Sequence, residues 1–152
     1  QSEALNETSY ITFLTLSRNF FLNAQSMHIP FVLAEVAKVA REVTNIACTL
    51  NKSLSVLPML RQAVQLLSPS PTCLTMAHSL YLQACMKGQM YDVAVDFIKT
   101  SNILEINLKQ APILSSDLLK YFYYAGVCYI AVDDYPNALA SLLQCMCTPS
   151  LA

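Results

Sequence analysis

Charge is scarce in this chain. Lys, Arg, Asp and Glu make up 12% of its 152 residues, whereas soluble domains carry about 25%. The net charge is -1 and no run of like charges occurs, so we expect neither nucleic acid nor a membrane surface as a partner. Hydrophobic residues make up 55%, so the chain can build a large core but has few charges to cover its outside. We therefore expect it either to be packed on both faces or to hide surface against partners.

Glycine and histidine are also scarce, which excludes several kinds of site. The only glycines, Gly88 and Gly126, cannot form a Gly-rich phosphate-binding loop. Neither His28 nor His78 lies in a His-Glu-x-x-His or paired metal-ligand spacing. A thiol and imidazole brought together by folding, such as Cys85 and His78, stay an open alternative, although a histidine without a catalytic role is favoured. The sequence thus predicts no enzyme, no catalytic residue, no metal, no cofactor and no small-molecule substrate.

The six cysteines do not indicate a disulfide framework. Most lie at small apolar positions of predicted helices, where a free thiol acts as a modest hydrophobe. Cys145 and Cys147 lack zinc-knuckle spacing, so we expect free thiols in a reducing compartment. The longest charge-free run, 62–86, is cut by Ser68-Pro69-Ser70-Pro71, so we expect no membrane span.

The last part of the chain predicts two antiparallel helices joined by a tight turn. The first, from about 117 to 132, follows Ser115 and Ser116, whose hydroxyls suit a helix cap. Pro136 fits the first turn of the second helix, which runs to about residue 147. A pair of this kind cannot bury its apolar face alone, so we expect other helices to stack on it.

Small and aromatic residues in this pair recur at the spacing of a tetratricopeptide repeat. Gly126 and Ala138 have almost no side chain, so we expect the two helices to approach closely there, with larger residues beside them. The predicted packing positions are Phe122, Ala125, Gly126, Tyr129, Tyr135, Ala138, Leu142 and Cys145. The alternative is a plain helical hairpin in an ordinary bundle.

Five further helices are predicted upstream from the 3.6-residue period of apolar side chains. They span about 8–23, 31–50, 54–67, 74–86 and 91–100. The last two echo the terminal pair 44 residues earlier, where Leu82, Cys85, Tyr91, Ala94 and Ile98 match Gly126, Tyr129, Tyr135, Ala138 and Leu142. We expect Gly88 to end one helix in a left-handed conformation and Ser53 to cap another. The apolar insert 102–115 is expected to lie against the repeats.

These features predict an all-α fold: a tetratricopeptide-like, right-handed solenoid of about seven helices, forming one domain over residues 1–152. Phe13, Phe20 and Phe21 exceed what one buried face of the first helix needs, so they are the candidate partner surface. The candidates for a continuing interface at the other end are Leu142, Met146 and the tyrosine-rich helix before them.

The run YFYYAGVCYIAVDDYPNALASLLQCMCTP resembles the helical-repeat region of the third-subunit family of the COP-nine (constitutive photomorphogenesis) signalosome. In that family a Tyr-Tyr-Gly-Gly aromatic helix is followed by a Lys/Asn-Phe turn, an Ala-Leu helix and a Thr/Ala-Pro end. Here Ala125-Gly126 stands in place of Gly-Gly. The resemblance covers about residues 28–149 and is strongest toward the end.

This resemblance implies a scaffold subunit whose N-terminal helical repeats precede a winged-helix PCI domain that is absent from these residues. It implies sister signalosome subunits as partners, in a nuclear and cytoplasmic complex that removes the ubiquitin-like modifier Nedd from cullins. The metalloprotease centre of that complex belongs to a different subunit. One alternative is another PCI-type scaffold, of the proteasome lid or of translation initiation. Another is an enzyme fragment whose catalytic part lies elsewhere.

Overall fold

The computed structural model describes residues 2–24, 29–107 and 113–148, with side chains from Glu7 and, after the first gap, from Val32. Over these ranges the chain forms seven α-helices and one 3₁₀ helix without a β-strand, which confirms the all-α prediction. The elements are α1 Ser2–Asn23, α2 Ile29–Thr49, η1 Ser53–Val56, α3 Leu57–Leu67, α4 Met76–Lys87, α5 Tyr91–Ser101, α6 Ser115–Ala131 and α7 Tyr135–Cys147.

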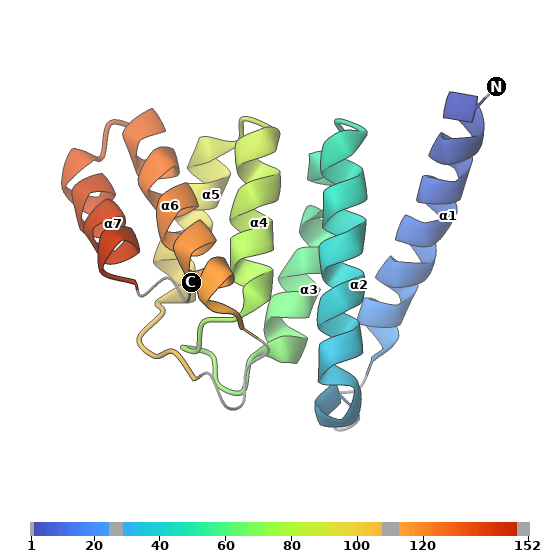
Figure 1. The fold of residues 1–152 in the computed structure, drawn as a ribbon, viewed down its shortest axis with the longest axis horizontal. Coiled ribbons are helices and arrows are strands. Elements are labelled where there is room, and N and C mark those ends of the chain that lie inside the picture. Colours follow the sequence, from blue (N-terminus) through green and yellow to red (C-terminus); the bar gives the residue numbers. More distant parts are fainter. Residues whose placement is uncertain (1, 25–28, 108–112, 149–152) are drawn as a thin grey trace.

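The helices stack in one direction along the molecule. In Figure 1, α1, α2, α4 and α6 run side by side, with α3 and α5 set behind them and α7 closing the end beside α6. The turns that follow α2, α4 and α6 all lie along the upper edge. Each helix therefore packs mainly on its neighbours in the stack, as in a helical-repeat solenoid.

Three helix pairs share the same connecting turn. In the α4–α5 turn, the Met90 N–H donates to the Cys85 carbonyl at 2.9 Å and the Gln89 N–H to the Met86 carbonyl at 3.2 Å. This is the Schellman arrangement, in which the second-last residue takes a left-handed conformation. The same two bonds close the turns at 47–52 and 129–134. The left-handed residues are Asn51, Gln89 and Asp133, with φ of 55°, 57° and 61°.

The α2–η1–α3 unit is therefore a third repeat, which the sequence pattern missed. The left-handed prediction for Gly88 is wrong, because its φ is -85° and Gln89 takes that conformation instead. Gly88 is needed for space rather than for its backbone angle. A Cβ at this position would lie 2.7 Å from Leu54 Cγ, on the preceding repeat.

Helix α4 is the centre of the core. Nine of its twelve residues are buried, and it contacts α2, α3, α5 and α6. Its buried polar groups have partners: Ser79 donates to the Met76 carbonyl at 2.8 Å, and His78 Nδ1 accepts from the Thr75 N–H at 3.1 Å. An evenly buried helix of this kind is expected at the middle of a stack.

Several predicted helix starts differ from the observed ones. Helix α1 begins at Ser2, six residues before the predicted Thr8. Ser53 makes no side-chain cap, and the predicted helix from Leu54 is divided into η1 and α3. Pro58 accounts for the division, because it has no N–H to donate and favours the first turn of a new helix.

Helix α6 is capped by an aspartate, not by the two serines before it. Its N-cap residue is Leu114, whose N–H donates to Asp117 Oδ2 at 2.9 Å. Ser115 and Ser116 lie inside the first turn instead. The predicted negative charge of Asp117 in this turn is thus present and directly hydrogen-bonded.

The first part of the insert, 102–107, lies on the α3–α4 loop. Leu104 and Glu105 N–H donate to the Thr72 carbonyl at 3.0 and 3.3 Å, and the Leu74 N–H donates to the Glu105 carbonyl at 3.0 Å. Ile103 packs on the core whereas Leu104 is exposed. The expectation that the insert lies against the repeats is met over these residues, and Leu108 lies outside the described ranges.

Candidate interaction surfaces

The α6–α7 crossing is organised around Gly126. A Cβ added to Gly126 would lie 2.7 Å from both Cγ and Cδ2 of Leu142, and 3.6 Å from the Ala138 carbonyl oxygen. Ala125, Tyr129 and Ala138 are buried beside this contact. The predicted close approach of the two helices at Gly126 and Ala138 is therefore observed.

Three predicted packing residues play smaller parts in this crossing. Phe122 is half-buried against the core, and the half-buried Cys145 Sγ lies 3.5 Å from the Leu119 carbonyl oxygen across the pair. Tyr135 is a correction: its side chain is 60% exposed, and its hydroxyl donates to Asp133 Oδ1 at 2.8 Å. It opens α7 at a position that faces outward, so it does not pack between the helices.

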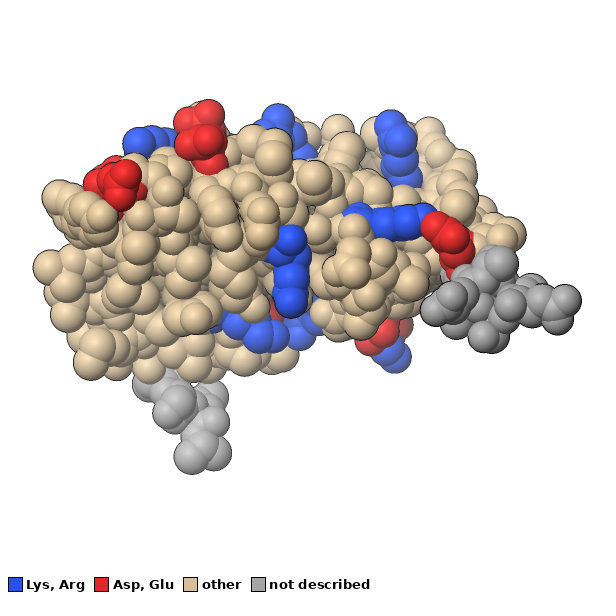
Figure 2. Space-filling view, turned by 90° about the horizontal axis from the view of Figure 1, so that it is seen from above, with Lys and Arg blue, Asp and Glu red and all other residues tan. Residues whose placement is uncertain are grey.

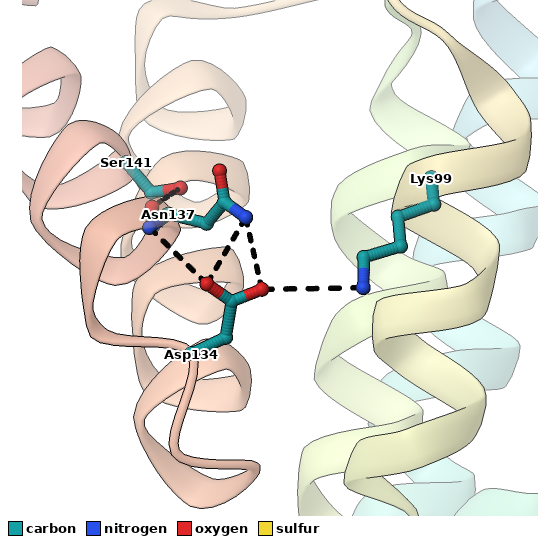
Figure 3. A network of polar contacts seen from close by, with 4 residues as sticks. All are labelled: Lys99, Asp134, Asn137 and Ser141. Atoms are coloured by element: carbon teal, nitrogen blue, oxygen red, sulfur yellow. Dashed lines mark hydrogen bonds and ion pairs between the residues drawn. The ribbon is translucent and has the colours of Figure 1, made fainter.

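A polar network ties α5 to the start of α7 (Figure 3). Asp134 is the N-cap of α7 and accepts from Asn137 Nδ2 at 3.0 and 2.9 Å. Lys99 Nζ lies 3.9 Å from Asp134 Oδ2 across the gap, and Ser141 Oγ donates to the Asn137 carbonyl at 2.9 Å. The network fixes the N-terminus of α7, and the ion pair with the exposed Lys99 contributes little to the stability of the fold.

The three phenylalanines of α1 do not form one surface. Phe21 is 1% exposed and belongs to the core, so it is wrong as a partner-surface residue. Phe13 is half-buried and Phe20 is 45% exposed. Successive helical residues point about 100° apart, so Phe20 and Phe21 face different directions. The exposed apolar residues of α1 are Ile11, Leu16, Phe20 and Leu22.

The opposite end of the stack exposes an apolar stripe on α7. Leu139, Leu143 and Met146 follow one another at helical spacing and are 61%, 51% and 83% exposed. Between residues 121 and 148 the only charged residues are Asp133 and Asp134. The end formed by α6 and α7, on the left of Figure 2, accordingly shows a wide area without charged side chains. Leu142, predicted for this interface, instead points inward to Gly126.

A groove of about 460 Å³ lies between α5, the 102–107 segment, α6 and α7. Its wall carries Ile103, Leu104, Glu105 and Ile106, and Phe122 and Tyr129 contribute aromatic surface. Polar side chains of α7, among them Gln144, line the other side. The groove thus combines apolar, aromatic and polar side chains.

No catalytic arrangement forms among the described side chains. His78 is buried, and burial lowers its pKa to about 4, so its imidazole is neutral and bonded within its own helix cap. Burial raises the pKa of the Cys85 and Cys128 thiols to about 12 and 11, which leaves them protonated and weakly nucleophilic. His28 lies outside the described residues.

The described part of the chain contains neither a cluster of metal ligands nor a membrane-spanning helix. No three His, Cys, Asp or Glu residues gather at metal-binding distance within residues 2–24, 29–107 and 113–148. Within those ranges, no helix combines the length and the hydrophobicity that crossing a bilayer requires. The exposed apolar residues of α1 and α7 are therefore the features of the described structure that indicate a function.

The family model for the N-terminal helical repeats of COP9 signalosome complex subunit 3 matches residues 1–152. The chain belongs to this family. The helix pairs joined by the turns at 47–52, 85–90 and 129–134 agree with the helical repeats that this description names. The match covers the whole chain, including α1, which the resemblance of the terminal run alone did not reach.

A curated relative supports the same family. The COP9 signalosome complex subunit 3 of Dictyostelium discoideum is 29% identical to this chain over 142 residues, covering 92% of the chain and 34% of the relative. The chain thus spans about a third of the length of the curated relative it matches. No solved structure matches the chain.

In this helical-repeat member of the signalosome family, the sequence predicted only some of the exposed apolar residues at the two ends of the stack. On α1 it named Phe20 but not Ile11, Leu16 or Leu22, and on α7 it named Met146 but not Leu139 or Leu143. The available signal was the helical phase, since Leu139, Leu143 and Met146 recur at intervals of 4 and 3. The large aromatic side chain of Phe21 suggested a surface residue, but Phe21 is buried.

Proposed function

We propose that this chain is the N-terminal helical-repeat part of a non-catalytic scaffold subunit of the signalosome. Its repeats bind sister subunits of that complex, which removes Nedd from the cullins of cullin-RING ubiquitin ligases in the nucleus and cytoplasm. Family membership supports the assembly, and the apolar stripe on α7 and the exposed face of α1 support a role in protein contact.

The exposed α1 face is the observation that carries the proposal. Leu16 and Phe20 lie one helical turn apart on α1, at the end of the stack, and are 62% and 45% exposed. Uncovered apolar side chains at this density mark binding surfaces. Aromatic residues such as Phe20 are enriched at the centres of such surfaces.

The test is co-purification of the full-length protein with its sister subunits. Phe20→Glu places a charge on the apolar face and should reduce the retained subunits at least about tenfold. Asn19→Glu adds the same charge to the neighbouring exposed residue and should retain them. Circular dichroism should be the same for both variants. Equal retention by the two would remove α1 from the interface.

A separate measurement tests the non-catalytic role. Cys147 is the exposed thiol of the chain and thus its most accessible nucleophile. We expect Cys147→Ala to leave cullin deneddylation by the reconstituted complex unchanged. A loss of turnover with assembly intact would contradict the scaffold role. Fluorescence microscopy of the tagged full-length protein tests the proposed nuclear and cytoplasmic distribution.

A further inference from the structure

The loop between α3 and α4 contains two Ser-Pro dipeptides that the scaffold role does not use. Ser68-Pro69-Ser70-Pro71 lies outside the helices, and both prolines are exposed. Kinases of the proline-directed class recognise serine followed by proline in an extended segment. A residue before proline is already restricted to extended conformations. Both dipeptides thus lie in an irregular loop, in which the Cys73 N–H donates to the Ser70 carbonyl at 3.1 Å and closes a turn that the kinase must open.

Of the two serines, Ser70 has the hydroxyl at the surface. Ser70 Oγ donates to Glu105 Oε1 in an exposed hydrogen bond, and Thr72 Oγ1 donates to the same oxygen at 3.1 Å. Ser68 Oγ is instead held inside the turn by the Ser70 and Cys73 carbonyls, at 2.6 and 3.0 Å. Ser70 is thus the more available acceptor for a phosphoryl group.

We propose that Ser70 is a phosphorylation site for a proline-directed Ser/Thr kinase, and that its modification releases the 102–107 segment from the α3–α4 loop. In the reaction Ser70 Oγ forms a bond to the γ-phosphorus of ATP. The bond from that phosphorus to the bridging oxygen breaks, and ADP leaves. The hydroxyl proton passes to the base of the kinase. The product carries a charge of about -1.5 to -2 where an O–H donor stood.

Release follows from the position of Glu105. Phosphorylation removes the Ser70 donor and sets phosphate oxygens against a carboxylate that they repel. Glu105 has no ion pair with any described residue, so no described cation offsets that repulsion. The segment is otherwise fixed to the loop by the backbone bonds that join Glu105 and Leu104 to Thr72, and Leu74 to Glu105. Displacing Glu105 loosens all three.

The released segment is one wall of the groove between α5 and α7. Ile103, Leu104, Glu105 and Ile106 line that groove, so their departure changes its shape and exposes Phe122 and Tyr129 further. The modification therefore acts on a surface at the C-terminal end of the stack from a loop more than 30 residues earlier. Phosphorylation of Ser70 and release of the 102–107 segment do not depend on signalosome assembly.

The experiment has two arms on the full-length protein. In the first, a purified cyclin-dependent kinase or a mitogen-activated protein kinase acts with Mg·ATP, and mass spectrometry locates the phosphate. We expect it on Ser70 in the parent and in Ser68→Ala, and its loss in Ser70→Ala. Phosphate on Ser68 alone, or on neither serine with both kinases, overturns the proposal.

In the second arm, phosphoserine is encoded at position 70 and hydrogen exchange is followed at the Leu74, Leu104 and Glu105 amides. We expect exchange about tenfold faster than in the unmodified protein. Glu105→Gln removes the carboxylate and should reverse most of the increase. Ser70→Ala, which loses the hydroxyl without gaining charge, should show a smaller change. Unchanged exchange in the phosphorylated protein overturns the release.

Discussion

Arg41 on α2 donates to Asp117 on α6 across 76 residues of sequence, with Nη2 and Oδ2 2.6 Å apart. The same Asp117 oxygen accepts from the Leu114 N–H at 2.9 Å, so one carboxylate caps α6 and joins it to α2. Asp117 is nearly buried, with 5% of its side chain exposed, whereas that of Arg41 is 30% exposed. The pair therefore joins the α2–η1–α3 repeat directly to the α6–α7 repeat.

Asp117→Ala should lower the free energy of unfolding by about 2–4 kcal/mol, because it removes the cap and leaves a partly buried guanidinium without its partner. Arg41→Gln keeps the cap and should cost less, which separates the two contributions. Asp96→Ala changes an exposed carboxylate of α5 and serves as the control, with an effect within about 0.5 kcal/mol. Urea unfolding monitored by circular dichroism measures all three. Equal stability of Asp117→Ala and Asp96→Ala would show that the bridge contributes nothing.

Gly126→Leu should destabilise the protein by about 1–3 kcal/mol, because even a Cβ at this position overlaps Leu142. The cost should shrink when Leu142→Ala clears the space, so the two substitutions couple in a double-mutant cycle. Thermal melting of the four proteins measures that coupling. Additive effects would mean that residue 126 does not meet Leu142.

The helices and the terminal crossing could be predicted from the sequence because they depend on local signals. Proline positions, apolar spacing and the small residues Gly126 and Ala138 all act within one helix pair. The third repeat was missed because Pro58 divides its second helix, so the aligned spacing of the later pairs does not extend to it. Its turn uses Asn51 as the left-handed residue, and the other two turns likewise use residues other than glycine.

The long-range features had no local signal. Nothing near Asp117 in sequence points to Arg41, because ion pairs between distant helices follow from how the stack is assembled. Likewise Phe20 and Phe21 are chemically identical neighbours, and only the contact of α1 with α2 and α3 determines which one is buried. The three phenylalanines of the candidate surface thus differ in burial, with Phe20 exposed, Phe13 half-buried and Phe21 in the core.

Phe21→Ala should cost about 3–5 kcal/mol of stability, since it leaves a cavity in the core beneath α1. Phe20→Ala, one residue earlier, should cost less than about 1 kcal/mol because that ring is largely in solvent. The two rings touch edge to face, with centroids 5.5 Å apart, so each substitution also removes this small contact equally. Chemical denaturation of the two variants provides the comparison. A larger loss for Phe20→Ala would mean that the phase of α1 is reversed.

His78 should make the fold sensitive to mild acid. Its pKa lies near 6.5 when the chain is unfolded and is lowered to about 4 by burial in the folded protein. Between these values the unfolded chain binds the proton and the folded protein does not. The neutral His78 therefore makes its full contribution to the free energy of unfolding above about pH 7. That contribution falls by up to about 3 kcal/mol as the pH drops to 4.

His78→Gln keeps a side-chain oxygen that can accept from the Thr75 N–H but cannot titrate, so its stability should fall less over the same range. Carboxylates titrate alike in both proteins, so the difference between their urea midpoints from pH 7 to 4.5 isolates the imidazole. Parallel curves would show that His78 is accessible to protons in the folded state.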